Sequence, residues 1–339
     1  MKKKIDNIIV GFLAGILVFL CSSGFAQDNQ KLAQTGFQFL SVVSDARAAA
    51  TGDAMTSLQL GSASLFFNPA GMAEMPYFID VTASTNQWIA DITHNTFSLA
   101  INPAKGGKYG VLGFSVQSVD YGEFYGTRVS ATDQGYEDTG KFKLNAIAMG
   151  VGYAKQLTDR FSVGGQMRWV QQDLGASVIP VISTADTSEK RVTNELEPLV
   201  FDFGTQFKTS IKSLVFGMSV RNFSKEIEYV DEGFQTPLVF NLGISMNLMD
   251  LMAEVPMGQS LYLSIEASHY RDHAEQVKFG LDYRLMNVLS VRGGYLSSND
   301  ESGLSFGLGV SQFGFALDYA YAPFGVFDKV QRMTARISL

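Results

Sequence analysis

The chain has 339 residues, of which 46% are hydrophobic, 17% charged and 12% aromatic, and its formal net charge is −7. This hydrophobic share argues against an intrinsically disordered protein. The lack of a basic cluster beyond the first few residues argues against nucleic acid as a partner. Glycine is abundant (33 residues) and proline scarce (8), a composition typical of many short strands joined by tight turns.

Residues 1–26 have the three parts of a secretory signal peptide. Lys2 to Lys4 form a basic region, and residues 8–20 form an apolar stretch that is short for a membrane span. Gly24 and Ala26 then place small side chains at the two positions that signal peptidase reads. We predict cleavage after Ala26, against the alternative of a permanent N-terminal anchor.

The only cysteine, Cys21, lies inside this signal segment. It follows Leu20, whereas lipid-modified cysteines usually follow a small residue, so lipidation is the less favoured alternative. After cleavage the chain would contain no cysteine, which leaves neither a disulfide nor a thiolate metal site.

Residues 27–76 are predicted to form a plug inside the structure that the rest of the chain builds. Ser44 or Asp45 is a candidate N-cap for a short helix over residues 46–50, which Gly52 would end. A second apolar stretch, 63–67, runs into a proline–glycine turn. The small residues of this region suit close packing. We assign this structural role to Asp45, Ala46, Arg47, Gly52, Asn68, Pro69, Ala70 and Gly71.

Residues 77–339 alternate apolar and polar side chains with a period of two. In the segment 277–285, for example, Phe279, Leu281 and Tyr283 alternate with Gly280 and Asp282. Most segments of this kind have the ~9–11 residues that a tilted membrane-spanning strand needs. We predict fourteen antiparallel strands at 77–86, 92–102, 107–121, 141–155, 160–173, 199–208, 212–221, 237–247, 260–270, 275–285, 288–297, 302–312, 313–322 and 329–339.

The links between these segments are long on one side and short on the other, as in outer-membrane β-barrels. Long loops are expected at 122–140, 174–198 and 222–236, and a short helix is expected within 248–259. The last segment runs to Leu339, so it can pair with the first and remove both sheet edges. The expected fold is therefore an all-β, fourteen-stranded antiparallel transmembrane barrel with a small N-terminal helical plug.

Charged side chains fall on the inward face of the predicted strands. Two interpretations stay open for them: a polar path or charged gate, and a network of ion pairs that holds the plug, with Asp45 and Arg47 taking part. The second is favoured because buried charges need partners. The candidate lumen charges are Arg168, Arg221, Lys278, Asp282, Arg284, Arg292, Asp318 and Arg332, with Lys208 and Arg336 on the same face.

The outward face carries aromatic residues expected to form belts at the membrane interfaces, namely Tyr153, Trp169, Tyr283, Tyr295, Tyr319 and Tyr321.

Catalysis, metal binding and a cofactor are not expected. His269 and His273 flank a predicted strand end, where their spacing imposes no metal geometry. Ser268 and His269 would face opposite sides of a strand, which argues against a hydrolase. Glycine-rich strand segments such as 303–307 are not followed by a helix and are not phosphate loops.

The plug region resembles a known family. The runs 39–40, 44–49, 52–54 and 68–73, together with Ala63, look like the start of PorV/PorQ-family outer-membrane proteins. The element Asn68-Pro69-Ala70-Gly71 is also similar to the hatch of FadL-type fatty-acid transporters, whose barrels have fourteen strands. The specific part covers about 35 residues, and the chain has Thr51 where family members often have methionine.

The resemblance implies an outer-membrane location, lipid contact and two alternative functions. A PorV/PorQ-type protein would be a non-enzymatic accessory of type IX secretion that contacts a translocon subunit and the C-terminal signal domains of cargo. The alternative is a FadL-like transporter of hydrophobic compounds. On the first interpretation, the predicted loops 122–140 and 174–198 would be the cargo surface.

Overall fold

The computed structural model describes residues 35–104, 108–130, 132–180, 189–229, 232–252, 258–297, 303–325 and 329–339. The predicted signal segment and its cleavage site after Ala26 lie outside the described residues. In the described ranges, no helix has both the length and the apolar character needed to cross a membrane.

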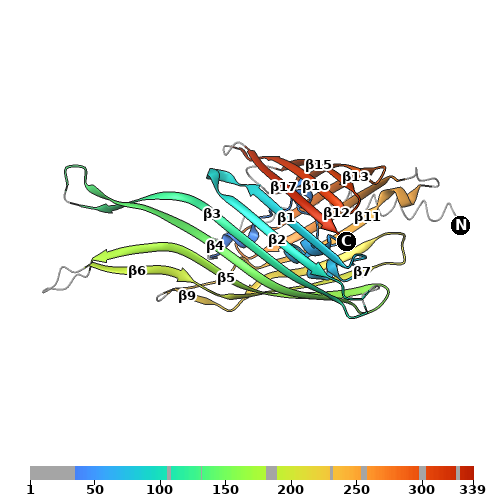
Figure 1. Cartoon of the computed structure of the whole chain (residues 1–339), viewed down its shortest axis with the longest axis horizontal. Helices are drawn as coiled ribbons and strands as arrows, with labels where there is room; N and C mark the ends of the chain where they lie inside the picture. The colour runs from blue at the N-terminus through green and yellow to red at the C-terminus, as the bar shows by residue number, and fades with distance from the viewer. Residues whose placement is uncertain are drawn as a thin grey trace.

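The strands form one closed antiparallel barrel (Figure 1). Most strands pair with the strands before and after them in the chain. In addition β1 pairs with β17, β5 pairs with β7 as well as with β4 and β6, and β8 pairs with β11. The strands are β1 (Ile79–Gln87), β2 (Thr93–Ile101), β3 (Val111–Val129), β4 (Tyr136–Gln156), β5 (Phe161–Pro180), β6 (Glu189–Leu196), β7 (Leu199–Lys208), β8 (Val215–Ser224), β9 (Ile227–Tyr229), β10 (Glu232–Phe234), β11 (Val239–Asn247), β12 (Ser260–Tyr270), β13 (Gln276–Leu285), β14 (Leu289–Leu296), β15 (Leu304–Gln312), β16 (Phe315–Pro323) and β17 (Lys329–Ser338).

The seventeen strands of the described residues fill only fourteen places around the wall. β6 and β7 both pair with β5 and follow each other in one place, and β9 and β10 pair only with each other, outside the wall. β6 and β7 are separated by Glu197 and Pro198, and proline cannot donate a hydrogen bond to a ladder. The fourteen-stranded barrel expected from the sequence is confirmed, and so is its closure between the first and last strands.

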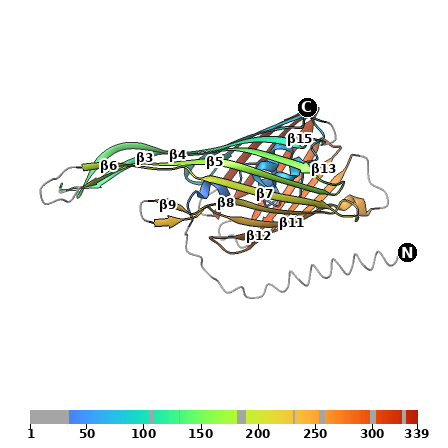
Figure 2. The same cartoon turned by 90° about the horizontal axis from the view of Figure 1, so that it is seen from below.

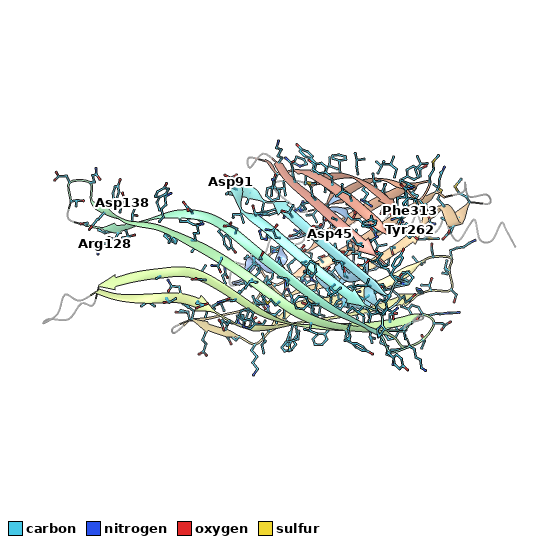
Figure 3. The ribbon with its side chains drawn as sticks, in the orientation of Figure 1. Asp45, Asp91, Arg128, Asp138, Tyr262 and Phe313 are labelled. Atoms are coloured by element: carbon cyan, nitrogen blue, oxygen red, sulfur yellow. The ribbon has the colours of Figure 1, made fainter. Side chains whose placement is uncertain are left out.

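The outer face of the barrel is apolar. On β15, Leu304, Phe306, Leu308 and Val310 point outward and each is more than half exposed, whereas the intervening Ser305 is buried. Figure 3 shows such side chains projecting outward around the wall. An exposed apolar belt of this kind suits contact with lipid.

Two hairpins extend far beyond the barrel at one end, which we call the ribbon end (Figures 1 and 2). One is formed by β3 and β4 and the other by β5 and β6, and the pairing of β4 with β5 stops at Asn145 and Asp173. Each hairpin leaves the wall at a β-bulge with an Asp-X-Gly sequence. The amide of Gly122 donates to Asp120 and that of Gly175 to Asp173, and both glycines have positive φ.

The prediction of loops at 122–140 and 174–198 is therefore wrong for much of their length. These residues form strands that the period of two did not reveal, because both faces of the β3–β4 hairpin are exposed to solvent. A strand without a buried face needs no apolar alternation. In the third predicted loop, 222–236, the short strands β9 and β10 pair with each other.

Short turns join the strands at the other end, which we call the turn end. The link between β15 and β16 is the pair Phe313-Gly314, and that between β13 and β14 contains Met286-Asn287, all with positive φ. The helix predicted within 248–259 is a single 3-10 turn, η5 (Leu248–Leu251).

The segment from Thr35 to Pro76 runs through the lumen from the ribbon end to the turn end. It begins beside Gln235, in a link at the ribbon end, and at the turn end the side chain of Asn102 donates to the carbonyl of Met75. Its helices pack against the inside of the wall. They are η1 (Gln38–Ser41), α2 (Ala46–Ala50), η2 (Gly61–Phe66) and η3 (Pro69–Met72), while η4 (Ile89–Asp91) links β1 to β2.

Glycines in the wall make room for the backbone of this segment. A Cβ added at Gly294 would collide with the backbone of Thr51 and Gly52, and one at Gly164 would collide with the backbone of Pro69 and Ala70. The neighbouring Gly293 faces open space, with nothing within 4 Å of an added Cβ. The inward glycines therefore let the plug backbone lie directly on the wall.

Gly294→Ala should lower the free energy of unfolding by about 1–3 kcal/mol, because the added methyl group forces the plug away from β14. Gly293→Ala is the matched control and should leave it unchanged. Both are measured by denaturant unfolding of the folded barrel in detergent. Equal effects of the two substitutions would refute the idea that Gly294 allows the plug backbone to pack against β14.

Candidate functional site

Asp282 on β13 is the centre of an ion-pair network between the plug and the wall. Its carboxylate accepts from Arg47 of α2 at 3.1 Å and lies 3.2 Å from the guanidinium of Arg292 on β14. Arg292 in turn donates to Asp318 on β16 at 2.5 Å. All four side chains are largely buried. The network therefore fastens α2 to three wall strands.

Further charged groups along the lumen have separate partners. Arg168 pairs with Asp202 at 2.7 Å. Lys278 pairs with Glu266 at 3.3 Å, and Glu266 also accepts from the backbone of Thr56 in the plug.

Three of the predicted lumen arginines make no ion pair among the described residues. Arg332 donates to the carbonyl of Val43, and Arg221 lies over the ring of Phe67. Arg284 faces a cavity at the turn end.

Of these ion pairs, that of Arg47 with Asp282 joins the plug to the wall, whereas those of Arg168 and Lys278 join wall strands to each other. The two cavities found in the middle of the lumen have volumes of only about 40 and 10 Å³. Around Arg221 and Lys278, which line these cavities, the plug and the wall are therefore closely packed.

The residues of the predicted plug motif have structural contacts. The carboxylate of Asp45 caps α2 by accepting from Ala48 at 2.8 Å, and the amide of Ala46 donates to Thr334 of β17. Gly52 has a φ of +61°, which permits its close approach to β13 and β14.

Asn68 accepts from Ala70 and donates to the carbonyls of Thr56 and Thr205. Pro69 occupies the first turn of η3, where no amide donor is needed. Gly71 lies against Leu58 and Ser64, where a side chain would collide.

A cluster of hydrogen bonds on Asp272 holds the start of this segment at the ribbon end. Thr35 and Gln38 donate to one carboxylate oxygen, at 2.7 and 2.6 Å, and His273 lies 2.8 Å from the other. The bond with His273, followed by those from Thr35 and Gln38, holds the pKa of Asp272 well below its usual range. Sequence reasoning did not find this contact, because its partners are more than 230 positions apart.

The start of the segment also buries an apolar cluster at the ribbon end, just below the point where β4 and β5 separate. Phe37, Phe39 and Leu40 are each no more than 3% exposed. They pack against inward-facing wall residues that are apolar here, namely Val119, Ala146, Ala148, Val170 and Val200. Inward-facing positions elsewhere are mostly polar. The change from polar to apolar residues at the inward-facing positions of β3 to β5 was therefore the sequence signal that could have revealed the cluster.

A cavity of about 510 Å³ opens at the turn end, and we call it the vestibule. Five cationic side chains and two carboxylates of the described residues line it. Among its cations are the predicted lumen charges Arg284, Lys208 and Arg336. It is thus chemically unlike the apolar cluster at the opposite end.

The other sequence candidates lie apart from these sites. Tyr153, Tyr295, Tyr319 and Tyr321 are exposed on the outer face, and Trp169 and Tyr283 are half-buried. His269 is exposed and pairs with Glu275, while Ser268 is buried, so the two side chains face opposite sides of the wall. No group of three or more potential metal-ligating residues occurs within the described ranges.

Solved outer-membrane channels share this fold. The toluene transporter TbuX of Ralstonia pickettii is 14% identical with a TM-score of 0.54, and the match covers 86% of this chain and 96% of that chain. The toluene transporter TodX of Pseudomonas putida has the same identity and TM-score, with 91% and 99% covered. A FadL homologue of Pseudomonas aeruginosa is 13% identical with a TM-score of 0.52, covering 88% and 99%.

No protein-family model and no curated protein sequence matches the chain. At these identities the structural likeness shows the fold. It supports the FadL-like part of the resemblance seen in the plug region and adds nothing specific to PorV/PorQ proteins.

Asp282→Asn should lower the free energy of unfolding by about 3–5 kcal/mol, because it leaves Arg47 and Arg292 buried with weakened partners. Glu137→Gln is the matched control. It removes a carboxylate from the exposed pair with Arg128, at 3.1 Å, and should cost less than about 1 kcal/mol. Denaturant unfolding in detergent measures both, and a small, equal loss would rule out a fastening role for Asp282.

Proposed function

We propose that the chain is an outer-membrane channel for small hydrophobic compounds, exported with cleavage after Ala26. In outer-membrane barrels the long loops are extracellular and the short turns periplasmic. The ribbon end would then face the outside and the vestibule the periplasm. The exposed apolar belt of the wall and the fold shared with toluene transporters support this placement.

The apolar cluster at the ribbon end is the observation that carries the proposal. A hydrophobic compound entering from outside would meet Val119, Val170 and Val200 once Phe37 and Phe39 gave way. Apolar pockets with a few polar groups nearby are the usual form of a small-molecule site. The phenyl groups of the plug occupy the space that such a compound would take.

The filled interior limits the route beyond that cluster. The ion pairs around Asp282 hold the rest of the plug against the wall, and the inward-facing glycines let its backbone lie directly on the strands. A compound must therefore either displace the plug or leave sideways near Asn145 and Asp173, where β4 and β5 stop pairing. The buried charges argue against a wide apolar pore along the axis.

Val119→Thr should slow uptake of a hydrophobic compound several-fold, because it puts a hydroxyl group of the same shape into the apolar cluster. Val129→Thr is the matched control on the same strand, since Val129 is 95% exposed on the β3–β4 ribbon. The measurement is uptake of radiolabelled toluene by cells that lack the protein and are complemented with each variant. Equal uptake by cells with Val119→Thr and with the wild type would count against entry through the cluster.

The second candidate function is an accessory or cargo-binding role in type IX-like secretion. The two hairpins at the ribbon end favour it, because they extend well beyond the barrel. The β3–β4 hairpin also carries exposed side chains such as Tyr125 and Val129. Figure 3 labels Arg128 and Asp138 on the β3–β4 ribbon, far from the lumen. The resemblance of the plug region to PorV/PorQ proteins points the same way. A channel for small compounds has no evident need for such ribbons.

Gentle detergent purification from native membranes, followed by mass spectrometry, separates the two functions. The secretion role predicts a very large outer-membrane subunit, or proteins sharing one C-terminal β-domain, and loss of both when a two-residue turn replaces residues 124–142. A stoichiometric apolar ligand without a protein partner would instead support the channel.

A further inference from the structure

The vestibule at the turn end has more positive than negative charge. Its cations are Arg47, Lys208, Lys212, Arg284 and Arg336, and its carboxylates are Glu74 and Asp80. This imbalance occurs in the part of an acidic chain where a hydrophobic compound would be expected to leave. A cavity of about 510 Å³ is also within the range of small-molecule sites, roughly 300–1,000 Å³.

Only some of these cations have a carboxylate partner. Lys208 pairs with Glu74, Arg47 pairs with Asp282, and Arg336 is 4.0 Å from Asp80. In the part of the chain that the structure describes, neither Arg284 nor Lys212 makes an ion pair.

Arg284 is the most informative of these side chains. Its Nε is buried and has no hydrogen-bond partner among the described residues. Asp282, two residues away on the same face of β13, already accepts from Arg47 and contacts Arg292. Because Arg284 lines the vestibule and makes no ion pair among the described residues, an anion bound there would supply its guanidinium with a charged partner.

The rest of the lining is suited to an organic body. Leu58, Met75, Leu214 and Tyr262 contribute apolar and aromatic surface to the same cavity as Arg284. Arginine binds carboxylate and phosphate through paired, charge-assisted hydrogen bonds. Lys212, in the turn between β7 and β8, adds a second positive charge to the lining, carried on the flexible side chain of a lysine.

We propose that the vestibule is a binding site for an organic oxyanion, a carboxylate or phosphate on an apolar or aromatic body, with Arg284 as its principal partner. The site is separate from the apolar cluster and faces the other end of the barrel. It would hold its ligand whether or not hydrophobic compounds pass through the barrel.

Isothermal titration of the full-length mature protein in detergent, with phenyl phosphate as the probe, tests this site. Inorganic phosphate and benzyl alcohol are titrated in parallel. Phenyl phosphate should bind more tightly than either, because only it combines the anion with an aromatic body. Its affinity should fall as salt is added, because the cavity is open to solvent.

Arg284→Gln should weaken binding of phenyl phosphate at least tenfold, and Lys212→Gln should weaken it several-fold. Lys155→Gln is the matched control. Lys155 follows the buried Ala154 on β4 near the turn end, so its side chain faces away from the lumen. Lys212 lies in an exposed turn, so its variant keeps the test valid if Arg284→Gln fails to fold.

Several results would overturn the proposal. Binding of benzyl alcohol as tight as that of phenyl phosphate would indicate a merely apolar cavity. Equally tight binding of inorganic phosphate would show that the organic body does not contribute to affinity. A loss of affinity with Lys155→Gln as large as that with Arg284→Gln would indicate a non-specific charge effect. No binding of phenyl phosphate would refute the site while leaving the uptake experiment on Val119 unaffected.

Discussion

The pairing of β1 with β17 is the constraint on which the rest of the structure depends. In a lipid environment each unpaired backbone N–H or C=O group costs several kcal/mol, so a sheet in the bilayer cannot keep an open edge. The backbone bonds between Ile79 and Leu339 complete the circle at the turn end. Once the circle is closed, every strand must place one face outward and one inward, which produces the apolar belt and the polar lumen.

A closed barrel of this size then has an interior to fill, and the chain fills it with its own N-terminal segment. Two devices hold that segment. Glycines such as Gly164 and Gly294 let backbone lie directly on the wall, and ion pairs around Asp282 fasten α2 to β13 and its neighbours. Both depend on inward-facing positions, so they would be lost if the strand register shifted by one residue.

The two ends of the filled lumen differ in chemistry. At the ribbon end, phenylalanines of the N-terminal segment cover an apolar cluster, and Asp272 holds the start of that segment through hydrogen bonds. At the turn end, the vestibule is open and positively charged. The barrel is thus apolar at one mouth, occupied by the plug in the middle and cationic at the other mouth.

The sequence by itself determined the number of strands in the wall, their inward and outward faces and the presence of short helices before the first strand. These features are encoded locally, in the alternation of residues such as Phe279 and Gly280, in the cap at Asp45 and in the turn at Asn68. Only the tertiary structure decided which charges pair, where the plug begins and how far the ribbons reach. Arg47 and Asp282 are 235 positions apart, and such long-range partners have no local signature. The ribbons have no buried face, and without one the physical cause of alternation is missing.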